Sequence, residues 1–453
     1  METAFEQYFK SLAGKKIAVL GLGVSNRPLV RLLLSYGCNV IGCDRTPREK
    51  LDAEVLELEK QGCVLKLGDD YLENITADLA FRTPGMHPAK LAALTQQGIE
   101  ITSEMEVFFT LCPCKIIAVT GSDGKTTTTT LISELLKASG KTVWLGGNIG
   151  TPLLPVCDQM DASDIAVVEL SSFQLMDMKH SADVAVITNL APNHLDMHKD
   201  MDEYVWAKTN IFNYQTPEGK LVLNWDNSIT AAFKGKGETR YFSRMGKVEN
   251  GVCLQGDMIC RDGEPVLDKK DILIPGEHNV ENYMAAILAV EGLVDDEIVR
   301  QVAKTFGGVE HRIELVRVKD GVRYYNDSIA SSPSRTIAGL RSFPEKVLLI
   351  AGGYDKKIPF DVLGPEVCEH VKTVYVNGAT AQKIRQAIEN APQYKPGHPE
   401  IVDCKDFTDA VEKSVSQAVS GDIVLMSPAC AAFDQFKNFM ERGKYFKKLI
   451  MEL

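Results

Sequence analysis

Residues 115–136 read KIIAVTGSDGKTTTTTLISELL and set the architecture around the middle of this 453-residue chain. They form an apolar run, a glycine-rich loop and a segment with helical character. Backbone N–H groups of such a loop can hold phosphate oxygens, Lys125 can neutralise them, and the Thr126 hydroxyl can ligate Mg²⁺. Val119 stands where the usual phosphate-loop pattern has its first glycine. The predicted order is still strand, phosphate loop and helix.

Short apolar runs follow this stretch and alternate with helical or loop segments. They include Ile165–Leu170, Val184–Ile187 and Leu221–Leu223. Such alternation is typical of a mostly parallel sheet with helices on its faces. Residues 250–274 differ, because strand-like runs are separated there by turn residues. A helix is then expected to begin near Asn279.

The N-terminal part shows a related pattern. An apolar run at Lys16–Leu20 ends in Gly21-Leu22-Gly23, and a helical segment and a second run, closed by Asp44, follow. This order resembles the opening of a Rossmann-like unit, although Asn26 replaces the third glycine of the dinucleotide pattern. A nicotinamide site and a turn that needs small residues both remain open as explanations of the glycines. A βαβ unit suited to a phosphate-bearing ligand is predicted in either case.

Gly307-Gly308 indicates a linker, and apolar runs separated by helices return beyond it, as at 313–318, Val347–Ile350 and Ile423–Met426. Three domains also fit the length, since one hydrophobic core rarely serves so long a chain. The predicted fold class is therefore α/β with three domains. They are a Rossmann-like domain over 1–102, a central phosphate-loop domain with a mostly parallel sheet over 103–308, and a Rossmann-like α/β domain over 309–453.

Composition and charge exclude several classes of protein. The formal net charge is -11, and the sequence shows no strong basic patch. Because such a surface repels phosphate backbones, we expect no nucleic-acid partner. No stretch has the length of a membrane span and the first residues contain no apolar signal region, so we expect no membrane association. The 11 scattered cysteines indicate reduced thiols and a cytoplasmic protein.

Two apolar runs of the central part are followed by residues that commonly bind metals. Glu169 closes one run, and His194 follows the next within Asn193-His-Leu-Asp196. Because the carboxyl ends of parallel strands share one edge of a sheet, both side chains are expected near the phosphate loop, where they can hold Mg²⁺. A solvated acid at a strand end is the competing interpretation of Glu169 taken alone. His194 weakens that interpretation.

Together these motifs resemble the Mur ligase family. The similar segments occur in the family's order along essentially the whole chain: residues 121–127, Glu169 to Leu175, 193–196, Tyr204-x-x-Ala-Lys208, 276–282, His311-Arg312, Asn326-Asp-Ser328 and Gly352-Gly353. Such a set is far more specific than the phosphate loop alone. The resemblance implies an ATP-dependent amide ligase, in which a substrate carboxylate takes the γ-phosphoryl group of ATP and an amine then attacks the acyl phosphate.

The resemblance also implies a nucleotide site. Lys125 and Arg312 would contact the γ-phosphate, Asn279 and Asn282 would face the adenine, and Asp327 would lie near the ribose. Taken alone, Asn279 would be an ordinary helix cap. The implied ATP-binding residues are Gly121, Ser122, Asp123, Gly124, Lys125, Thr126, Thr127, Asn279, Asn282, Arg312 and Asp327.

The metal site implied by the resemblance contains two Mg²⁺ ions. Thr126 and Glu169 would hold one ion, and His194 and Lys208 would serve the second. Lys208 would carry a carbamate, which turns a cation into an anionic ligand. The sequence alone indicates an exposed helix lysine at this position. The implied catalytic residues are Lys125, Glu169, His194, Lys208 and Arg312.

Both ends of the chain are most similar to the family member that adds glutamate. The implied substrates are UDP-N-acetylmuramoyl-L-alanine, D-glutamate and ATP, and the implied enzyme is a cytoplasmic monomer of peptidoglycan synthesis. The first domain would bind UDP, and the last would bind the amino acid through Lys356 or the adjacent Lys357. The implied substrate-binding residues are Ser25, Asp44, Arg45, Thr46, Thr83, Gly85, Asn148, Ser171, His194, Ser331, Lys356, Phe433 and Phe439.

Three positions depart from the family pattern. Asp123 stands where asparagine is usual, Ile329 where lysine is frequent, and Ala432 where some relatives have serine. The first adds a negative charge near the phosphates, and the others remove a cation and a hydroxyl.

Three other hypotheses are compatible with parts of the pattern. A sibling ligase, such as another Mur ligase or a folate polyglutamate synthase-like enzyme, would share the ATP site and differ in its need for a UDP-sugar. A nucleotide-dependent switch would keep the phosphate loop without needing Glu169, His194 and Lys208 together. A nicotinamide-dependent oxidoreductase rests only on Gly21 and Gly23.

Overall fold

The structure is a computed structural model of the chain, and it describes residues 2–192 and 197–453. His194, a residue of the predicted metal site, lies outside the described residues, as do 193, 195 and 196. The chain divides into two compact units. Unit 1 contains Met1–Lys269 and Glu281–Val302, and unit 2 contains Lys270–Val280 and Ala303–Leu453.

The first sheet of unit 1 has five parallel strands in the order β3-β2-β1-β4-β5. On β1, Ile17 and Val19 pack with α2 and α3, whereas Ala18 and Leu20 pack with α4. Because successive side chains of the strand point to opposite faces, helices pack on both faces of the sheet. The elements are α1 (Ala4–Ser11), β1 (Lys16–Leu20), α2 (Arg27–Ser35), β2 (Asn39–Asp44), α3 (Ala53–Lys60), β3 (Val64–Leu67), β4 (Leu79–Arg82), α4 (Ala92–Gln96) and β5 (Glu100–Thr102).

The second sheet of unit 1 has nine strands in the order β14-β13-β12-β11-β10-β9-β6-β8-β7. Strands β6 to β12 run parallel to one another. Strands β13 and β14 extend the sheet as antiparallel strands. The strands are β6 (Lys115–Thr120), β7 (Val143–Gly147), β8 (Ile165–Glu169), β9 (Val184–Ile187), β10 (Lys220–Asn224), β11 (Glu238–Ser243), β12 (Gly251–Gln255), β13 (Met258–Arg261) and β14 (Glu264–Asp268).

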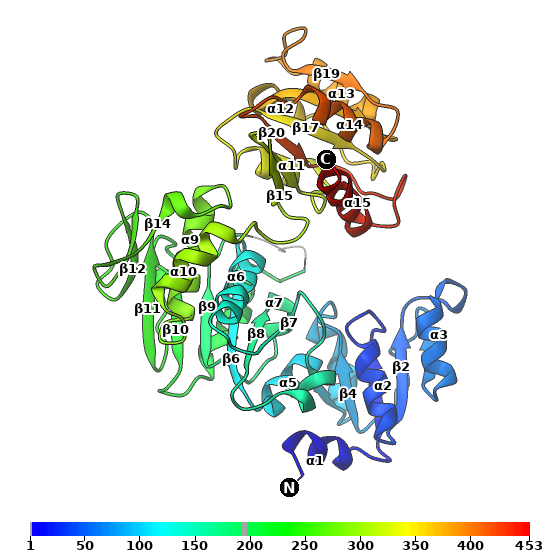
Figure 1. Cartoon of the computed structure of the whole chain (residues 1–453). Coiled ribbons are helices and arrows are strands. Elements are labelled where there is room, and N and C mark those ends of the chain that lie inside the picture. Colours follow the sequence, from blue (N-terminus) through cyan, green and yellow to red (C-terminus); the bar gives the residue numbers. More distant parts are fainter. Residues whose placement is uncertain (1, 193–196) are drawn as a thin grey trace. The chain divides into compact units, whose positions relative to one another are not determined.

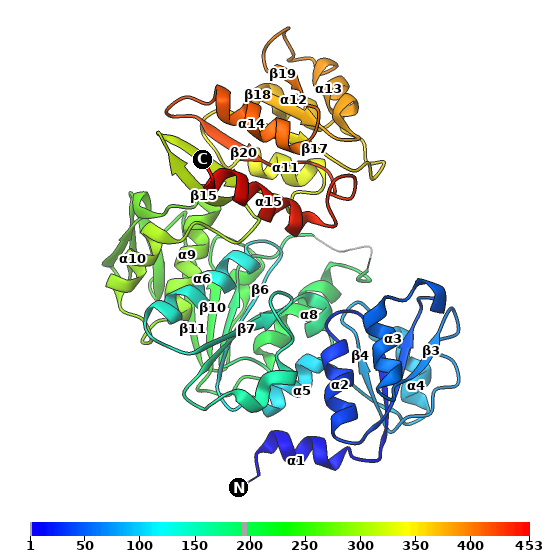
Figure 2. The same ribbon diagram turned by 45° about the vertical axis from the view of Figure 1, so that its right-hand side comes forward.

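Helices cover this sheet. Figure 1 shows α6, α9 and α10 beside strands β6, β9 and β10, and Figure 2 shows α8, which contacts β6. Strands β8 and β9 are buried along their whole length, as expected for parallel strands with both faces covered. The helices are α5 (Glu104–Leu111), α6 (Lys125–Ala138), α7 (Ser172–Leu175), α8 (Met201–Asn213), α9 (Glu277–Ala289) and α10 (Asp296–Thr305).

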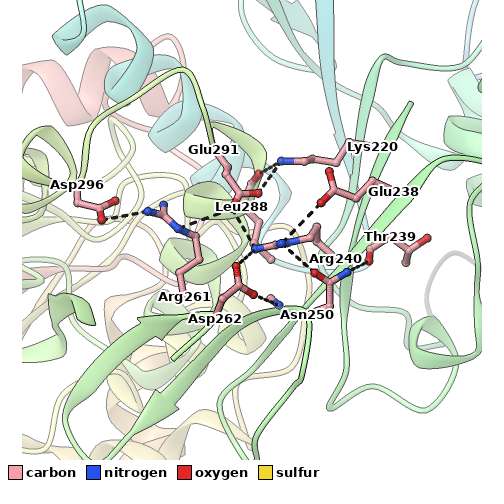
Figure 3. Close-up of polar contacts among 11 residues, drawn as sticks. Lys220, Glu238, Thr239, Arg240, Asn250, Arg261, Asp262, Leu288, Glu291 and Asp296 are labelled. Atoms are coloured by element: carbon pink, nitrogen blue, oxygen red, sulfur yellow. Dashed lines mark hydrogen bonds and ion pairs between the residues drawn. The ribbon is translucent and has the colours of Figure 1, made fainter. Parts of the chain in front are cut away.

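A network of ion pairs joins strands β10, β11 and β13 to the ends of α9 and α10 (Figure 3). The buried Arg240 contacts Asp262 at 2.6 Å and Glu291 at 3.0 Å. Lys220 reaches Glu291 at 2.8 Å, and Asp296 of α10 pairs with Arg261 of β13. Because Arg240 and Glu291 each pair with several charges, the network ties α9 and α10 to these strands.

The sheet of unit 2 has six strands in the order β15-β16-β20-β17-β18-β19, all parallel except for the antiparallel pair β15 and β16. Val347 and Leu349 of β17 pack with α11 to α13, and Leu348 and Ile350 pack with α14 and α15 (Figure 2). The elements are β15 (Glu314–Lys319), β16 (Val322–Asn326), α11 (Pro333–Leu340), β17 (Val347–Gly352), α12 (Leu363–His370), β18 (Val371–Asn377), α13 (Ala381–Glu389), β19 (Glu400–Asp403), α14 (Phe407–Gln417), β20 (Ile423–Met426) and α15 (Phe439–Met451).

The predicted α/β class with mostly parallel sheets is confirmed. The helix expected near Asn279 begins at Glu277. The hairpin of β15 and β16 was missed, although Asp320-Gly321, both with positive φ, is a typical hairpin turn. One hydrophobic cluster runs from Phe5 to Leu223, which explains why residues 1–102 join the middle sheet in one compact unit. Within the described residues, no helix is long and apolar enough to cross a membrane.

Candidate active site

The phosphate loop follows β6, which lies in the middle of its sheet between β8 and β9. Gly121 has a φ of 148°, and a Cβ there would lie 2.0 Å from Oγ1 of Thr188, so the loop requires glycine at this position. Gly124, with a φ of 78°, leads into α6. The first N–H groups of a helix lack intrahelical acceptors, so the loop and the start of α6 form an anion site.

Neighbouring segments hold this loop from both sides. The Ser122 hydroxyl donates to the carbonyl of Ala191 at 2.9 Å and lies 2.8 Å from the hydroxyl of Tyr204 on α8. The N–H of Asp123 donates to Oδ1 of Asn189 at 2.9 Å. The exposed Asp123 side chain itself is not needed for these contacts. Ser122 thus supports the shape of the loop through its side chain.

Lys125 lies at the start of α6 and bonds to the loop itself. Its Nζ donates to the carbonyls of Gly121 at 2.9 Å and Ser122 at 2.7 Å. One turn later, Oγ1 of Thr128 donates to Oδ1 of Asn282 at 3.1 Å. The predicted adenine-binding residue Asn282 therefore lies against the loop in unit 1. Thr126 and Thr127 are half-buried in the first turn of α6.

Glu169, the last residue of β8, is buried next to the end of β6. Its Oε1 accepts a hydrogen bond of 2.7 Å from Nδ2 of Asn148. Its Oε2 is buried and has no hydrogen-bond partner within the described part of the chain. A buried carboxylate oxygen without a partner is costly. A cation bound at this oxygen would remove that cost, so the residue fits a Mg²⁺ ligand.

Lys208 is buried on α8, with only 2 % of its surface exposed, so the interpretation as an exposed lysine is wrong. Tyr204, Ala207, Lys208 and Ile211 form the buried stripe of the helix, and this spacing could have revealed the burial. Its Nζ donates to Oγ1 of Thr120 at 3.0 Å. Burial lowers the pKa of Lys208 well below its ordinary value; the charge of Lys125 adds to this effect and Glu169 opposes it.

The structure thus brings three of the predicted metal-site residues, Thr126, Glu169 and Lys208, to one end of β6 and β8. The fourth, His194, is not described. Among residues 2–192 and 197–453, no cluster of three or more His, Cys, Asp or Glu side chains could hold a metal ion. Among the described residues of the predicted metal site, Glu169 is therefore the one carboxylate.

A pocket lies between the first sheet and the middle sheet of unit 1, and it contains the predicted substrate residues Ser25 and Asn148. The lining residues also include Asn26, Arg82, Pro84, Ser103, Glu104, Gly147 and Gln174. Ser171, near Gln174, caps α7 and is half-buried. Arg82 was not predicted as a site residue, although a charged residue within the apolar run LAFR was a signal that could have found it.

The other predicted UDP residues surround the end of β1. Both carboxylate oxygens of Asp44 accept backbone bonds, at 2.7 Å from Leu22 and at 2.9 Å from Thr46. A Cβ on Gly21 would lie 2.7 Å from the Thr83 side chain, so these loops are close together. Arg45 and Gly85 are exposed.

In unit 2, the predicted amino-acid residues fall into two groups. Nζ of Lys356 lies 3.5 Å from Oγ of Ser331, and the exposed ring of Phe433 contacts that of Tyr354 at a centroid distance of 5.7 Å. Phe439 instead lies at the start of α15, with its ring near His311. The backbone of Tyr354 bonds to Ala431, which joins the two loops of the first group.

Three more predicted residues belong to unit 2. Asp327 is buried; its Oδ2 accepts a bond of 2.7 Å from Ser427, and burial raises its pKa to about 7. Arg312 is exposed. Asn279 is buried and donates to the carbonyl of Pro275 at 2.6 Å. The hydrogen bonds of Asp327 with Ser427 and of Asn279 with Pro275 lie within unit 2. The nucleotide roles of both residues stay predictions.

Comparison with known proteins identifies the class to which this fold and site belong. The Mur ligase middle domain matches residues 119–290, and the Mur ligase glutamate ligase domain matches residues 311–430. These matches cover more than half of the chain. The chain therefore belongs to the Mur ligase family.

Relatives that match the chain over nearly its full length include ligases that share one name. The UDP-N-acetylmuramoylalanine–D-glutamate ligase of Acetivibrio thermocellus is 51% identical, with 99% of each chain covered. The ligase of the same name from Ruminiclostridium cellulolyticum is 47% identical, with 100% of each chain covered. The solved UDP-N-acetylmuramate-alanine ligase of Thermotoga maritima shares the fold, with a TM-score of 0.57, 17% identity, and 97% of this chain and 99% of that chain covered.

Proposed function

We propose that the protein is an ATP-dependent ligase that joins D-glutamate to UDP-N-acetylmuramoyl-L-alanine and releases ADP and phosphate, a step of peptidoglycan synthesis. The observation that carries this proposal is 51% identity over 99% of the chain with a ligase named for these two substrates. The site supports the chemistry. The phosphate loop and Glu169, one oxygen of which has no partner among the described residues, lie at the carboxyl ends of adjacent strands. The buried Lys208 of α8 bonds to Thr120 at the same end of β6.

The reaction needs positive groups around a crowd of negative charge. An oxygen of the L-alanyl carboxylate forms a bond to the γ-phosphorus of ATP, and ADP leaves. The neutral amine of D-glutamate then attacks the acyl carbon, loses a proton, and phosphate leaves as the amide bond forms. The loop N–H groups and Lys125 can bind the phosphoryl oxygens in both steps. A bound Mg²⁺ ion supplies further neutralisation of the phosphates.

The proposal includes two Mg²⁺ ions and a carbamate on Lys208. Thr126 and Glu169 would hold one ion, and His194 and modified Lys208 would serve the other. A lowered lysine pKa favours the neutral amine, which is the form that adds CO₂. Incubation with ¹³C-labelled bicarbonate should therefore produce a carbamate NMR signal that is absent from Lys208→Gln. An equal signal from both proteins would contradict the modification.

Three assignments extend this proposal. Residues 1–102 would bind the UDP-substrate, 103–308 ATP, and 309–453 the amino acid; each range contains one of the three sheets. The enzyme would act as a monomer, which light scattering can check. It would act in the cytoplasm, a location that the free thiols of all eleven cysteines support.

The decisive experiment measures ADP release by the purified protein with Mg²⁺ and ATP. We expect turnover only when UDP-N-acetylmuramoyl-L-alanine and D-glutamate are both present. L-Glutamate, D-alanine and a diamino acid should each fail to replace D-glutamate. L-Glutamate has the opposite configuration and cannot place its amine and both carboxylates as D-glutamate does, and the other two leave polar groups of the site unpaired. ADP release without the UDP-sugar, or equal use of another amino acid, would overturn the proposal.

A further inference from the structure

Arg82, the last residue of β4, has a completely buried guanidinium group, with 1% of the residue exposed. Its Nε donates to Oδ2 of Asp177 at 2.6 Å, and Nη2 donates to the other carboxylate oxygen. Nη2 also donates to the carbonyl of Phe173 at 2.9 Å. The guanidinium thus makes a two-pronged contact with one carboxylate and holds the backbone of the same segment.

The opposite side of the guanidinium faces its own loop. Nη1 lies 3.3 Å from the carbonyl of Met86 and 3.5 Å from that of Thr83. This loop contains Thr83 and Gly85, both proposed to bind UDP. The segment on the other side, 171–177, begins two residues after Glu169. One buried cation therefore joins the substrate loop of the first sheet to the segment that follows the metal-binding carboxylate.

Other contacts show that the segment 171–177 is held in one position. Oγ of Ser172 lies 2.8 Å from Nε2 of His198. The ring of Phe173 stacks on the His198 ring, with a centroid distance of 5.2 Å and an interplanar angle of 4°. Nδ1 of His198 is 3.4 Å from Oε2 of Glu203, and the same oxygen is 3.5 Å from Nε2 of His87. The segment is thus fixed from α8 as well as from Arg82.

We propose that Arg82 is a positioning residue that couples the loop 83–86 to the segment 171–177, so that binding of the UDP-substrate and the orientation of Glu169 depend on each other. Packing alone does not require a cation here, because burying a guanidinium is costly unless its N–H groups find acceptors. The planar fork of arginine matches a carboxylate and three backbone carbonyls together, which lysine does not. Arg82 also lines the pocket assigned to the UDP-substrate, together with Pro84 of the loop and Gln174 of the segment 171–177. This inference rests on the proposed function for its substrate.

Two variants test the coupling. Asp177→Asn removes the charge but keeps the size of the partner, and Arg82→Lys keeps the charge but removes the fork. A matched control is Asp262→Asn, which removes one carboxylate from the buried Arg240 in the network of Figure 3, also in unit 1. The measurements are thermal unfolding, the KM of each substrate, kcat, and backbone hydrogen exchange in residues 83–87 and 171–178.

Both test variants should raise the KM of UDP-N-acetylmuramoyl-L-alanine by about tenfold and lower kcat, while the Kd of an ATP analogue without the UDP-substrate changes by less than about twofold. Hydrogen exchange should rise together in both segments. The control should lower the melting temperature without this pattern. An unchanged KM for the UDP-substrate, or the same KM pattern in the control, would overturn the inference. If the wild-type protein does not use these substrates, the proposed function is wrong. Hydrogen exchange still tests the coupling, because a rise in both segments together supports it and a rise in one segment alone contradicts it.

Discussion

The buried carboxyl group of Glu104 allows a quantitative test of the structure. Glu104 lies in the first turn of α5, and its Oε1 accepts a hydrogen bond of 2.7 Å from the N–H of Leu154. Burial raises the pKa of Glu104 from 4.5 to about 7, and the N–H groups of Leu154 and Leu153 oppose part of that effect. The folded protein therefore holds a proton at this site that the unfolded chain has already lost.

The sign of the pH dependence follows from this difference. Between pH 4.5 and about 7, the folded state binds more protons than the unfolded state, so the free energy of unfolding falls as the pH rises through this range. The difference between these two pKa values corresponds to on the order of 3 kcal/mol. Stability from this group is present below pH 4.5 and is lost once the pH exceeds about 7.

Glu104→Gln removes the ionisation while it keeps the side-chain shape and an oxygen that can accept from Leu154. We expect the variant to match the wild type near pH 5 and to be more stable at pH 8, by on the order of 1–3 kcal/mol. Urea unfolding followed by circular dichroism at both pH values measures this difference. Glu54→Gln is the control of opposite sign, because bonds from Arg31 and Arg27 lower the pKa of Glu54. An equal effect of Glu104→Gln at pH 5 and pH 8 would refute the reasoning.

Three further predictions concern the candidate site. Lys125→Ala should reduce turnover by about 10²- to 10³-fold, because a cation at the transferring group is lost, with little change in the melting temperature; near-normal ADP release would refute the role. Gly121→Ala should abolish binding of an ATP analogue in calorimetry, because its Cβ would lie 2.0 Å from a neighbouring hydroxyl oxygen; retained affinity would show that the loop adapts. Lys356→Ala should raise the KM of D-glutamate about tenfold, and Lys357→Ala should not; the reverse result would assign the amino acid to Lys357.

Local patterns were sufficient to predict much of the fold. The strand, phosphate loop and helix at residues 115–138 follow from an apolar run, two glycines and a helical segment that are adjacent in the chain. The parallel strands β8, β9 and β20 follow from buried apolar runs. An apolar run at 313–318 was predicted and corresponds to β15, but β16 was not predicted, so the hairpin was missed although its turn carries a strong local signal.

The chemical state of the site depends on contacts between distant residues. Motifs indicated Glu169 and Lys208, but not that one oxygen of Glu169 has no partner in the described chain or that Lys208 is buried. Ser331 and Lys356 were predicted to belong to one amino-acid pocket, and the structure places their polar atoms 3.5 Å apart.

The sequence by itself determined the order of strands and helices, the phosphate loop and the family, because periodicity and motifs are properties of neighbouring residues. Only the tertiary structure showed that Arg82 binds Asp177, a partner 95 positions away. The two residues belong to segments that follow different sheets of unit 1, β4 in one and β8 in the other, and only tertiary packing brings these segments together. No local pattern specifies which carboxylate a buried arginine meets. Burial and charge are sums over such non-local neighbours, so the pKa of Lys208 and the pairing of Arg82 emerge only when the chain has folded.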